Sequence, residues 1–133
     1  MAGWVEVGDR ALVSGNCVVH QYVRIGRFAM LRGLSRTSRD VPPFCIMDLT
    51  HTLRGINVVG LRRGGFDAIS IRALRKAFTS VFGGRQNLKL ALERLEVDGP
   101  HPAEVNELIA FVRASKRGVA FGPHDDRALA DDR

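Results

Sequence analysis

The chain has 133 residues, 45% of them hydrophobic, and its 20 lysines and arginines against 14 acidic residues give a formal net charge of +6 at pH 7. This composition is typical of a soluble globular protein, and the positive balance favours an anionic partner: phosphate, nucleic acid, an anionic membrane or an acidic protein. No apolar run reaches the roughly 18 residues of a membrane-spanning helix and the N-terminus has no signal-peptide pattern, so we expect a cytoplasmic protein without an integral membrane segment.

A six-residue repeat runs through residues 1–41. One set of apolar or β-branched residues stands at every sixth position, namely Val7, Val13, Val19, Ile25, Leu31 and Thr37. Small or β-branched residues follow each of them four places later, namely Ala11, Cys17, Val23, Ala29, Ser35 and Val41. A strand repeats every two residues and a helix every 3.6, so a period of six indicates a hexapeptide β-helix with three hexads to a coil. The six hexads predict about two coils.

Two glycines and two cysteines add detail to this repeat. Gly8 and Gly26 each follow a residue of the first set and lie 18 residues apart, so we expect them to stack in successive coils at a tight corner. Cys17 falls on an inward position, which predicts a buried free thiol. Cys17 and Cys45 have no metal-ligand spacing and form no disulfide framework, so we expect no metal site.

The repeat is expected to stop at Asp40–Phe44, because the sequence Asp-Val-Pro-Pro-Phe contains two prolines that cannot continue a hydrogen-bonded ladder. Residues 42–65 are then predicted to form a connecting loop, with one short strand at Phe44–Met47. Glycines make the end of this loop rich in turns.

Three amphipathic helices are predicted within residues 66–118. The first begins after Asp67 as its N-cap and stops at Gly83 and Gly84. The second begins at Asn87, and the third has Pro102 in its first turn and Gly118 beyond its end. Residues 119–133 contain four aspartates and little that could pack, so a frayed tail is expected there.

Three motifs carry a resemblance to a known family. Val19–Gly26 contains a His-Gln pair, Asp40–Phe44 contains the Pro-Pro stop, and Gly55–Phe66 contains an Asn-x-x-Gly-Leu-Arg-Arg stretch. In this order and at near-identical spacing they resemble the C-terminal part of the acyl-carrier-protein:UDP-N-acetylglucosamine O-acyltransferases, which begin lipid A biosynthesis. A hexad repeat alone would be weaker, because many other acyl- and acetyltransferases share it.

The resemblance implies a homotrimer of left-handed β-helices with active sites between neighbouring subunits. It implies transfer of a 3-hydroxyacyl chain from acyl carrier protein to the 3-hydroxyl of UDP-N-acetylglucosamine, without a cofactor. The expected fold is mixed β and α: the last coils of a truncated left-handed parallel β-helix over residues 1–41, a loop with a substrate-binding segment over 42–65, a three-helix C-terminal domain over 66–118, and a disordered tail over 119–133.

The family's general base is a histidine on an earlier coil, which we expect upstream of this chain. No catalytic residue is therefore assigned, and the chain alone is expected to be inactive. His20 matches the later histidine of the His-Gln pair, and the resemblance assigns His20 and Gln21 to substrate binding. An outward imidazole and an amide both suit a sugar or a phosphate. From the residues alone, a solvated surface histidine and a polar corner residue are the alternatives.

The resemblance also assigns Asn57, Arg62 and Arg63 to substrate binding. Guanidinium groups bind diphosphate oxygens through paired hydrogen bonds, and Arg63 is the better match to the residue at the nucleotide diphosphate. The chain departs from the family's pattern at Gly64, where a second arginine is usual, and at Val59, where an acidic residue is usual. An ordinary solvated arginine pair is the alternative.

An acyl-chain groove is assigned to Gly33 and His51 by the same resemblance. Gly33 falls where the family sets acyl-chain length, and a glycine there leaves room for a longer chain; a turn glycine is the alternative. His51 matches a histidine near the far end of the groove. Arg32 and Arg36 stand beside the groove, where they either narrow it or contribute to a face for acidic acyl carrier protein.

Two other functions stay open. A non-catalytic, trimeric hexapeptide-repeat module could bind a sugar nucleotide or acyl carrier protein with the same surface and no base. A small basic nucleic-acid binder is disfavoured, because one tryptophan and one tyrosine without interleaved basic residues do not form a stacking platform. We therefore expect no nucleic-acid partner.

Overall fold

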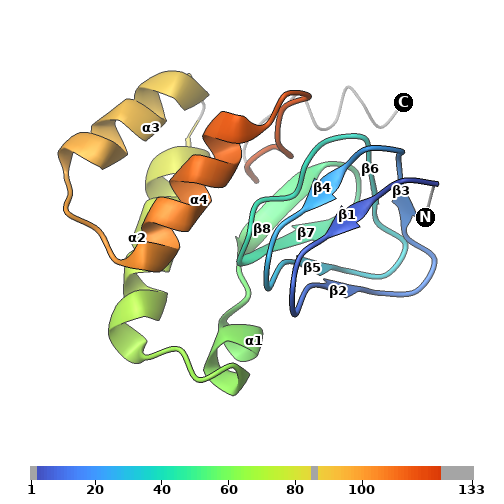
Figure 1. Ribbon diagram of the computed structural model, residues 1–133, viewed down its shortest axis with the longest axis horizontal. Coiled ribbons are helices and arrows are strands. Elements are labelled where there is room, and N and C mark those ends of the chain that lie inside the picture. The colour runs from blue at the N-terminus through green and yellow to red at the C-terminus, as the bar shows by residue number, and fades with distance from the viewer. Residues whose placement is uncertain (1–2, 85–86, 124–133) are drawn as a thin grey trace.

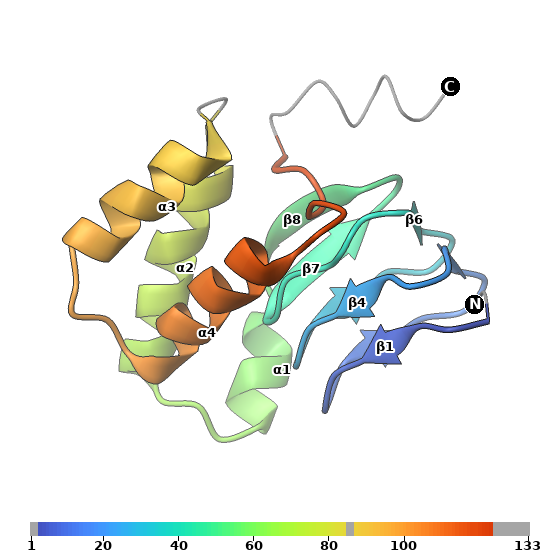
Figure 2. The same cartoon turned by 45° about the horizontal axis from the view of Figure 1, so that its top comes forward.

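The computed structural model describes residues 3–84 and 87–123. A stack of short strands lies beside a group of helices, and α4 runs between the strands and the other long helices (Figures 1 and 2). The first six strands are β1 (Glu6–Val7), β2 (Leu12–Val13), β3 (Val18–Val19), β4 (Arg24–Ile25), β5 (Met30–Leu31) and β6 (Arg36–Thr37).

These strands form a parallel β-helix. Each of the first three pairs in parallel with the strand 18 residues later, so β1 lies on β4, β2 on β5 and β3 on β6, with Val7 opposite Ile25. The inward residues Val19, Leu31 and Thr37 are at most 1% exposed, whereas Val7 in the first coil is 42% exposed. The hexad prediction is confirmed, since one coil is three hexads and the predicted positions face inward in the second coil.

The corners of the coils use a left-handed backbone conformation at non-glycine residues. The φ angles lie between 59° and 68° at Arg10, Asn16, Tyr22, Phe28 and Leu34. This conformation costs roughly 1–2 kcal/mol at a residue other than glycine. The hydrogen-bonded ladders on both sides of each corner hold the corner residue in this conformation. The strained corner residues therefore also repeat every six residues, like the inward residues.

Gly8 and Gly26 stack as predicted, but not for the expected reason. Neither has a positive φ angle. A Cβ on Gly8 would lie 2.6 Å from the backbone nitrogen of Arg27, and a Cβ on Gly26 would lie 2.4 Å from the nitrogen of Pro43. Glycine is needed in this column because the backbones of successive coils come too close for a side chain.

The stack does not end at the two prolines. Val41 pairs with Ile25, strand β7 (Cys45–Asp48) pairs in parallel with β5, and Thr50 pairs with Arg36, which makes a third, shortened coil. The expectation that the Pro-Pro sequence stops the ladder is wrong because Val41 and Phe44, on either side of the prolines, supply the donors to the coil below, at 2.9 Å each. Strand β8 (Thr52–Ile56) then pairs antiparallel with β7.

Four helices lie in the described ranges. The predicted ones are α2 (Ala68–Phe82), α3 (Leu88–Val97) and α4 (Ala103–Ala114), and Asp67 and Asn87 cap the first two as expected. Asp67 accepts the N–H of Ser70 at 2.7 Å, and this bond lowers the pKa of its carboxyl. The expectation of a connecting loop over residues 42–65 is wrong in part. This segment also contains β8 and a further helix, α1 (Val58–Arg63). None of these helices is long and apolar enough to cross a membrane.

The segment after α4 returns to the β-helix, which corrects the expected tail. Val119 pairs with Asp40, Phe121 pairs with Thr52, and both apolar side chains are at most 5% exposed. The prediction failed because Val119 and Phe121 pack against residues that lie far away in sequence. Residues 124–133 of the predicted tail lie outside the described residues.

One aromatic cluster joins the two parts of the molecule. The rings of Phe28, Phe44 and Phe66 lie 5.0–6.4 Å apart, and the Arg27 guanidinium sits 5.3–5.6 Å from all three ring centres. The same guanidinium donates to both carboxylate oxygens of Glu107 on α4, at 2.9 and 3.2 Å, which raises the pKa of Arg27. The Arg27 guanidinium therefore links the β-helix to the segment after α1 and to α4.

The close backbone approach at Gly8 and Gly26 predicts the effect of a substitution on the free energy of unfolding. Gly26→Ala is expected to destabilise the protein by about 1–3 kcal/mol or more, because the added methyl group meets backbone that cannot move without displacing a coil. Equilibrium urea unfolding measures this change. Gly15→Ala is the matched control, since a Cβ there meets nothing within 4 Å. Equal stability of the two variants would contradict the close-approach explanation.

Candidate functional site

The predicted sugar-binding pair lies on the outside of the β-helix. His20 and Gln21 follow β3 at a corner, and both are exposed. The His20 backbone is part of the coil, with its N–H on the carbonyl of Thr37 at 3.0 Å. Neither side chain bonds to another described residue, so an imidazole and an amide are available to a ligand, as the outward position predicted.

Gly33 is also exposed and sits on the preceding coil's Gly15. A Cβ at Gly33 would meet only the carbonyl oxygen of Gly15, at 3.6 Å, which is ordinary van der Waals contact. The fold itself therefore does not require glycine at position 33. The surface at this corner is left open by the absence of a side chain, not by backbone strain.

His51 is used inside the fold. Its ring is 7% exposed, and its Nδ1 accepts the N–H of Ser38 at 3.3 Å and lies 3.0 Å from the Thr37 hydroxyl. The ring also packs edge-on against Phe121. The structure thus places His51 between the second coil and the returning C-terminal segment, where it contacts protein rather than an open groove.

Asn57 holds α1 on the β-helix. Its amide donates to the carbonyl of Phe28 at 2.9 Å, and its side-chain oxygen accepts the N–H of Gly60 at 3.1 Å. The side chain is 8% exposed, and a Cβ on Gly60 would lie 2.4 Å from it. Asn57 therefore positions the arginines at the other end of this short helix, and both ends of its amide are already bonded.

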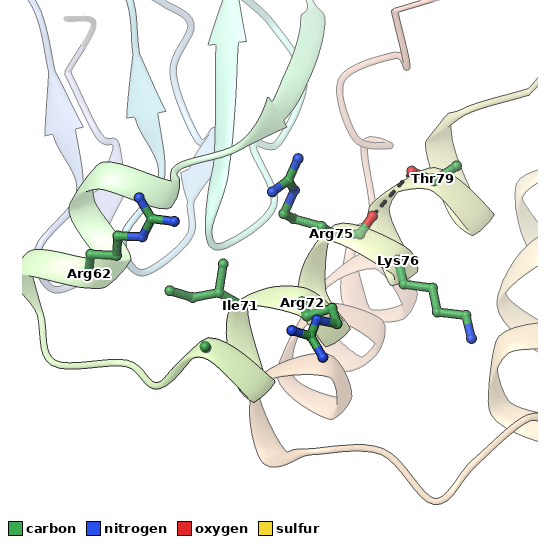
Figure 3. Close-up of a pocket in the computed structure, with 7 residues that line it drawn as sticks. Arg62, Ile71, Arg72, Arg75, Lys76 and Thr79 are labelled. Atoms are coloured by element: carbon green, nitrogen blue, oxygen red, sulfur yellow. Dashed lines mark hydrogen bonds between the residues drawn. The ribbon is translucent and has the colours of Figure 1, made fainter.

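The two arginines of α1 do not share one groove. Arg62 points toward α2 and lines a groove of about 420 Å³ with Arg72, Arg75 and Lys76 (Figure 3). Ala68, Ile71 and Thr79 complete the lining, and no carboxylate is part of it. Arg63 is exposed and lies at the end of α1, directly before Gly64. We call the groove lined by Arg62, Arg72, Arg75 and Lys76 the α1–α2 groove.

The α1–α2 groove is the feature that sequence reasoning did not find. None of its four cations forms an ion pair with another described residue, so their charges add and create a positive potential. The signal was present, because Arg72, Arg75, Lys76 and Thr79 stand at helical spacing and so lie on one face. That face opposes the apolar face that the helix prediction relied on.

The arginines beside the expected acyl groove have different surroundings. Arg32 pairs with Asp48 at 3.3 Å, and Arg54 approaches the same carboxylate at 3.9 Å. The Arg36 Nε donates to the Thr50 hydroxyl at 3.0 Å. Asp48 thus offsets part of the charge of Arg32 and Arg54, whereas no carboxylate lines the α1–α2 groove.

The cysteines and potential metal ligands offer no reactive centre in the described part of the chain. Cys45 is fully buried, which raises the pKa of its thiol, and the half-buried Cys17 donates to the carbonyl of Arg32 at 3.1 Å. Cys17 is thus less buried than its inward position predicted. Within residues 3–84 and 87–123, no three His, Cys, Asp or Glu side chains come together as metal ligands.

Comparison with known proteins places this geometry in context. The family described as "Udp N-acetylglucosamine O-acyltransferase; Domain 2" matches residues 40–120, more than half of the chain. A protein from Burkholderia orbicola named acyl-[acyl-carrier-protein]–UDP-N-acetylglucosamine O-acyltransferase is 44% identical over 124 residues, which cover 90% of this chain and 47% of that protein.

Solved structures give the same picture. The UDP-N-acetylglucosamine acyltransferase of Bacteroides fragilis matches with a TM-score of 0.82 and 33% identity, covering 90% of this chain and 47% of that chain. The enzyme of the same name from Arabidopsis matches with a TM-score of 0.81 and 32% identity, covering 87% and 44%. The chain thus spans about half the length of the relatives that it matches.

The role of Asn57 as an anchor can be tested by substitution. Asn57→Ala is expected to cost about 1–3 kcal/mol of unfolding free energy, because it leaves the buried Phe28 carbonyl without its partner and removes the cap of α1. Urea unfolding gives the number. Asn106→Ala is the matched control, since that exposed amide makes one long bond of 3.4 Å. A cost no larger than the control's would exclude the anchoring role.

Proposed function

The chain belongs to the UDP-N-acetylglucosamine O-acyltransferases, a family of left-handed β-helix enzymes, and we propose that it supplies the carrier-docking and nucleotide-binding part of such an enzyme. The reaction is transfer of a 3-hydroxyacyl chain from acyl carrier protein to the 3-hydroxyl of UDP-N-acetylglucosamine, the first step of lipid A biosynthesis. The observation that carries this proposal is the α1–α2 groove, where four cations and no carboxylate face a common space.

An acidic carrier protein fits this groove by charge. Four uncompensated cations raise the rate of encounter with a negatively charged protein and fix its orientation. The apolar floor formed by Ala68 and Ile71 gives a partner helix a surface to pack on. Arg62 belongs to this docking surface under the proposal, which leaves Arg63 as the arginine for the nucleotide diphosphate.

The sugar nucleotide is assigned to the outward residues of the β-helix. His20 and Gln21 have free hydrogen-bonding groups for the sugar or a phosphate, and Gly33 leaves an open path for the acyl chain. Asn57 acts by holding α1, and His51 acts indirectly, through its contacts with Thr37 and Ser38 next to β6. Active sites between neighbouring subunits of a cytoplasmic homotrimer complete the proposal, with residues 66–118 as the helical domain.

The chemistry requires a base that we do not assign here. The sugar hydroxyl oxygen attacks the thioester carbonyl, its proton passes to a base, and the carrier thiol leaves as the ester forms. Three histidines lie in the described ranges. His51 is buried, His101 binds the carbonyl of Leu95 through its Nε2, and His20 is the exposed one, proposed as a substrate-binding residue.

Docking of the carrier is testable by charge removal. Arg72→Gln with Lys76→Gln is expected to weaken acyl carrier protein binding about tenfold at low salt, mainly through a slower association rate. Surface plasmon resonance over a salt series measures both rates. The matched control is Lys89→Gln with Lys116→Gln, two exposed lysines outside the groove. Equal losses in the two double variants would rule out docking at this groove.

The division between binding and chemistry gives a second test. The 133-residue protein is expected to bind both UDP-N-acetylglucosamine and acyl carrier protein in calorimetry, yet to show no acyl transfer by mass spectrometry of the products. Product formation would contradict the assignment of His20, His51 and His101 to roles other than the base. Binding of one ligand without the other would favour the non-catalytic module, and no heat with either would remove both functions.

A further inference from the structure

A second groove, of about 480 Å³, lies at the C-terminal end of α1, where Gly64 is part of its lining. Its lining comes from the corners after β1 and β4 and from the segment that follows α1, and consists of Asp9, Arg10, Arg27, Phe28, Gly64 and Phe66. It shares no lining residue with the α1–α2 groove. The coil corners lie beside α1 in both views of the fold (Figures 1 and 2).

Two arginines line this second groove, and one of them, Arg27, is already bonded to another side chain. Arg27 makes two hydrogen bonds to Glu107, at 2.9 and 3.2 Å, and lies over three phenylalanine rings. Its charge is balanced by a carboxylate, and its guanidinium is held in place by α4. Arg27 thus builds the wall of the groove and is not free to bind a ligand.

The other arginine is free. Arg10 stands exactly one coil of 18 residues before Phe28, so the β-helix register stacks its guanidinium over that ring, 5.9 Å from the ring centre. The side chain is exposed and makes no hydrogen bond or ion pair with a described residue. A cation held over an aromatic face keeps its N–H groups at the edge available for an anion.

The backbone at Gly64 brings this arginine close to the end of α1. A Cβ on Gly64 would lie 2.7 Å from Cε1 of Phe28, so the chain passes directly over the ring and no side chain fits at position 64 while the ring is there. Arg63 is the residue immediately before this contact. Arg10 lines the same groove as Gly64, and Arg63 is the last residue of α1, directly before Gly64 in the chain.

We propose that Arg10 is a second anion-binding residue of the site, which takes a diphosphate oxygen of the nucleotide sugar together with Arg63. The inference rests on the proposed function, because it assumes that a nucleoside diphosphate is the ligand at this end of α1. Two guanidinium groups from separate elements would grip a diphosphate better than Arg62 and Arg63 together, because Arg62 lines the α1–α2 groove instead.

Asp9 gives the proposal an internal check. Its carboxylate lines the same groove and opposes an anion there. If a phosphate binds beside Arg10, removing the Asp9 charge must strengthen binding while removing the Arg10 charge weakens it. Structural damage would instead weaken binding in both variants.

The experiment measures UDP binding to the full chain by calorimetry in Arg10→Gln, Arg10→Lys, Asp9→Asn and Arg63→Gln, with Lys89→Gln as a distant charge control. Arg10→Gln is expected to weaken UDP about tenfold and Arg10→Lys less, because lysine keeps the charge and loses the fork. Asp9→Asn is expected to strengthen UDP a few-fold. Uridine, which has no phosphate, is the matched ligand whose affinity these changes should not alter.

The possible outcomes separate this inference from the function beneath it. If UDP binds and Arg63→Gln weakens it while Arg10→Gln behaves like Lys89→Gln, the role of Arg10 is excluded and the nucleotide site stands. If Asp9→Asn and Arg10→Gln both weaken UDP, the effect is structural and the inference fails. If the unaltered chain binds neither UDP nor uridine, the nucleotide site fails and takes this inference with it.

Discussion

The corner formed by Arg27 and Phe28 places the rest of the chain on the β-helix. Phe28 adopts a left-handed conformation, which leaves its carbonyl free for Asn57 and its ring exposed to the segment after α1. Arg27 reaches from the same corner to Glu107 on α4. Because one corner bonds to α1, to the segment behind it and to α4, the positions of both grooves depend on it.

The net positive charge of the chain is distributed unevenly for a structural reason. On the β-helix, arginines face neighbouring coils that carry acids, so Arg24 meets Glu6 at 3.1 Å and Arg32 meets Asp48. On α2, Arg72 and Lys76 line a groove without a carboxylate, and neither forms an ion pair with a described residue. The positive composition of the chain therefore points to three particular places for an anionic partner: one face of α2, Arg62 of α1, and Arg10 of the β-helix.

What the sequence could predict is what depends on residues close along the chain. The inward set such as Val19 and Leu31 repeats locally, and the caps Asp67 and Asn87 bond within their own first turns. No local pattern predicted strand β8, the return of Phe121 or the third coil, because their pairing partners lie far away in sequence.

The candidate site divides in the same way. The outward position of His20 follows from the hexad count alone, and its exposure agrees. The engagement of Asn57 with the Phe28 carbonyl and of His51 with Ser38 follows from what lies opposite in space, 29 and 13 residues away. Arg10 was not singled out because its significance comes from the ring one coil below and the glycine across from it.

The return of the C-terminal segment to Asp40 has a mechanical consequence. Asp40 exchanges backbone bonds with Gly118 and Ala120 at 2.9 Å, and its carboxylate accepts the Ser115 hydroxyl at 2.7 Å. The helical segment thus leaves the β-helix at β8 and rejoins it beside the same coil. A segment attached at one end can rotate about that attachment, whereas a segment attached at both ends is held in one orientation. Tilting of α2 and α4 against the coils would have to break both attachments together, so a ligand that spans them meets a rigid frame.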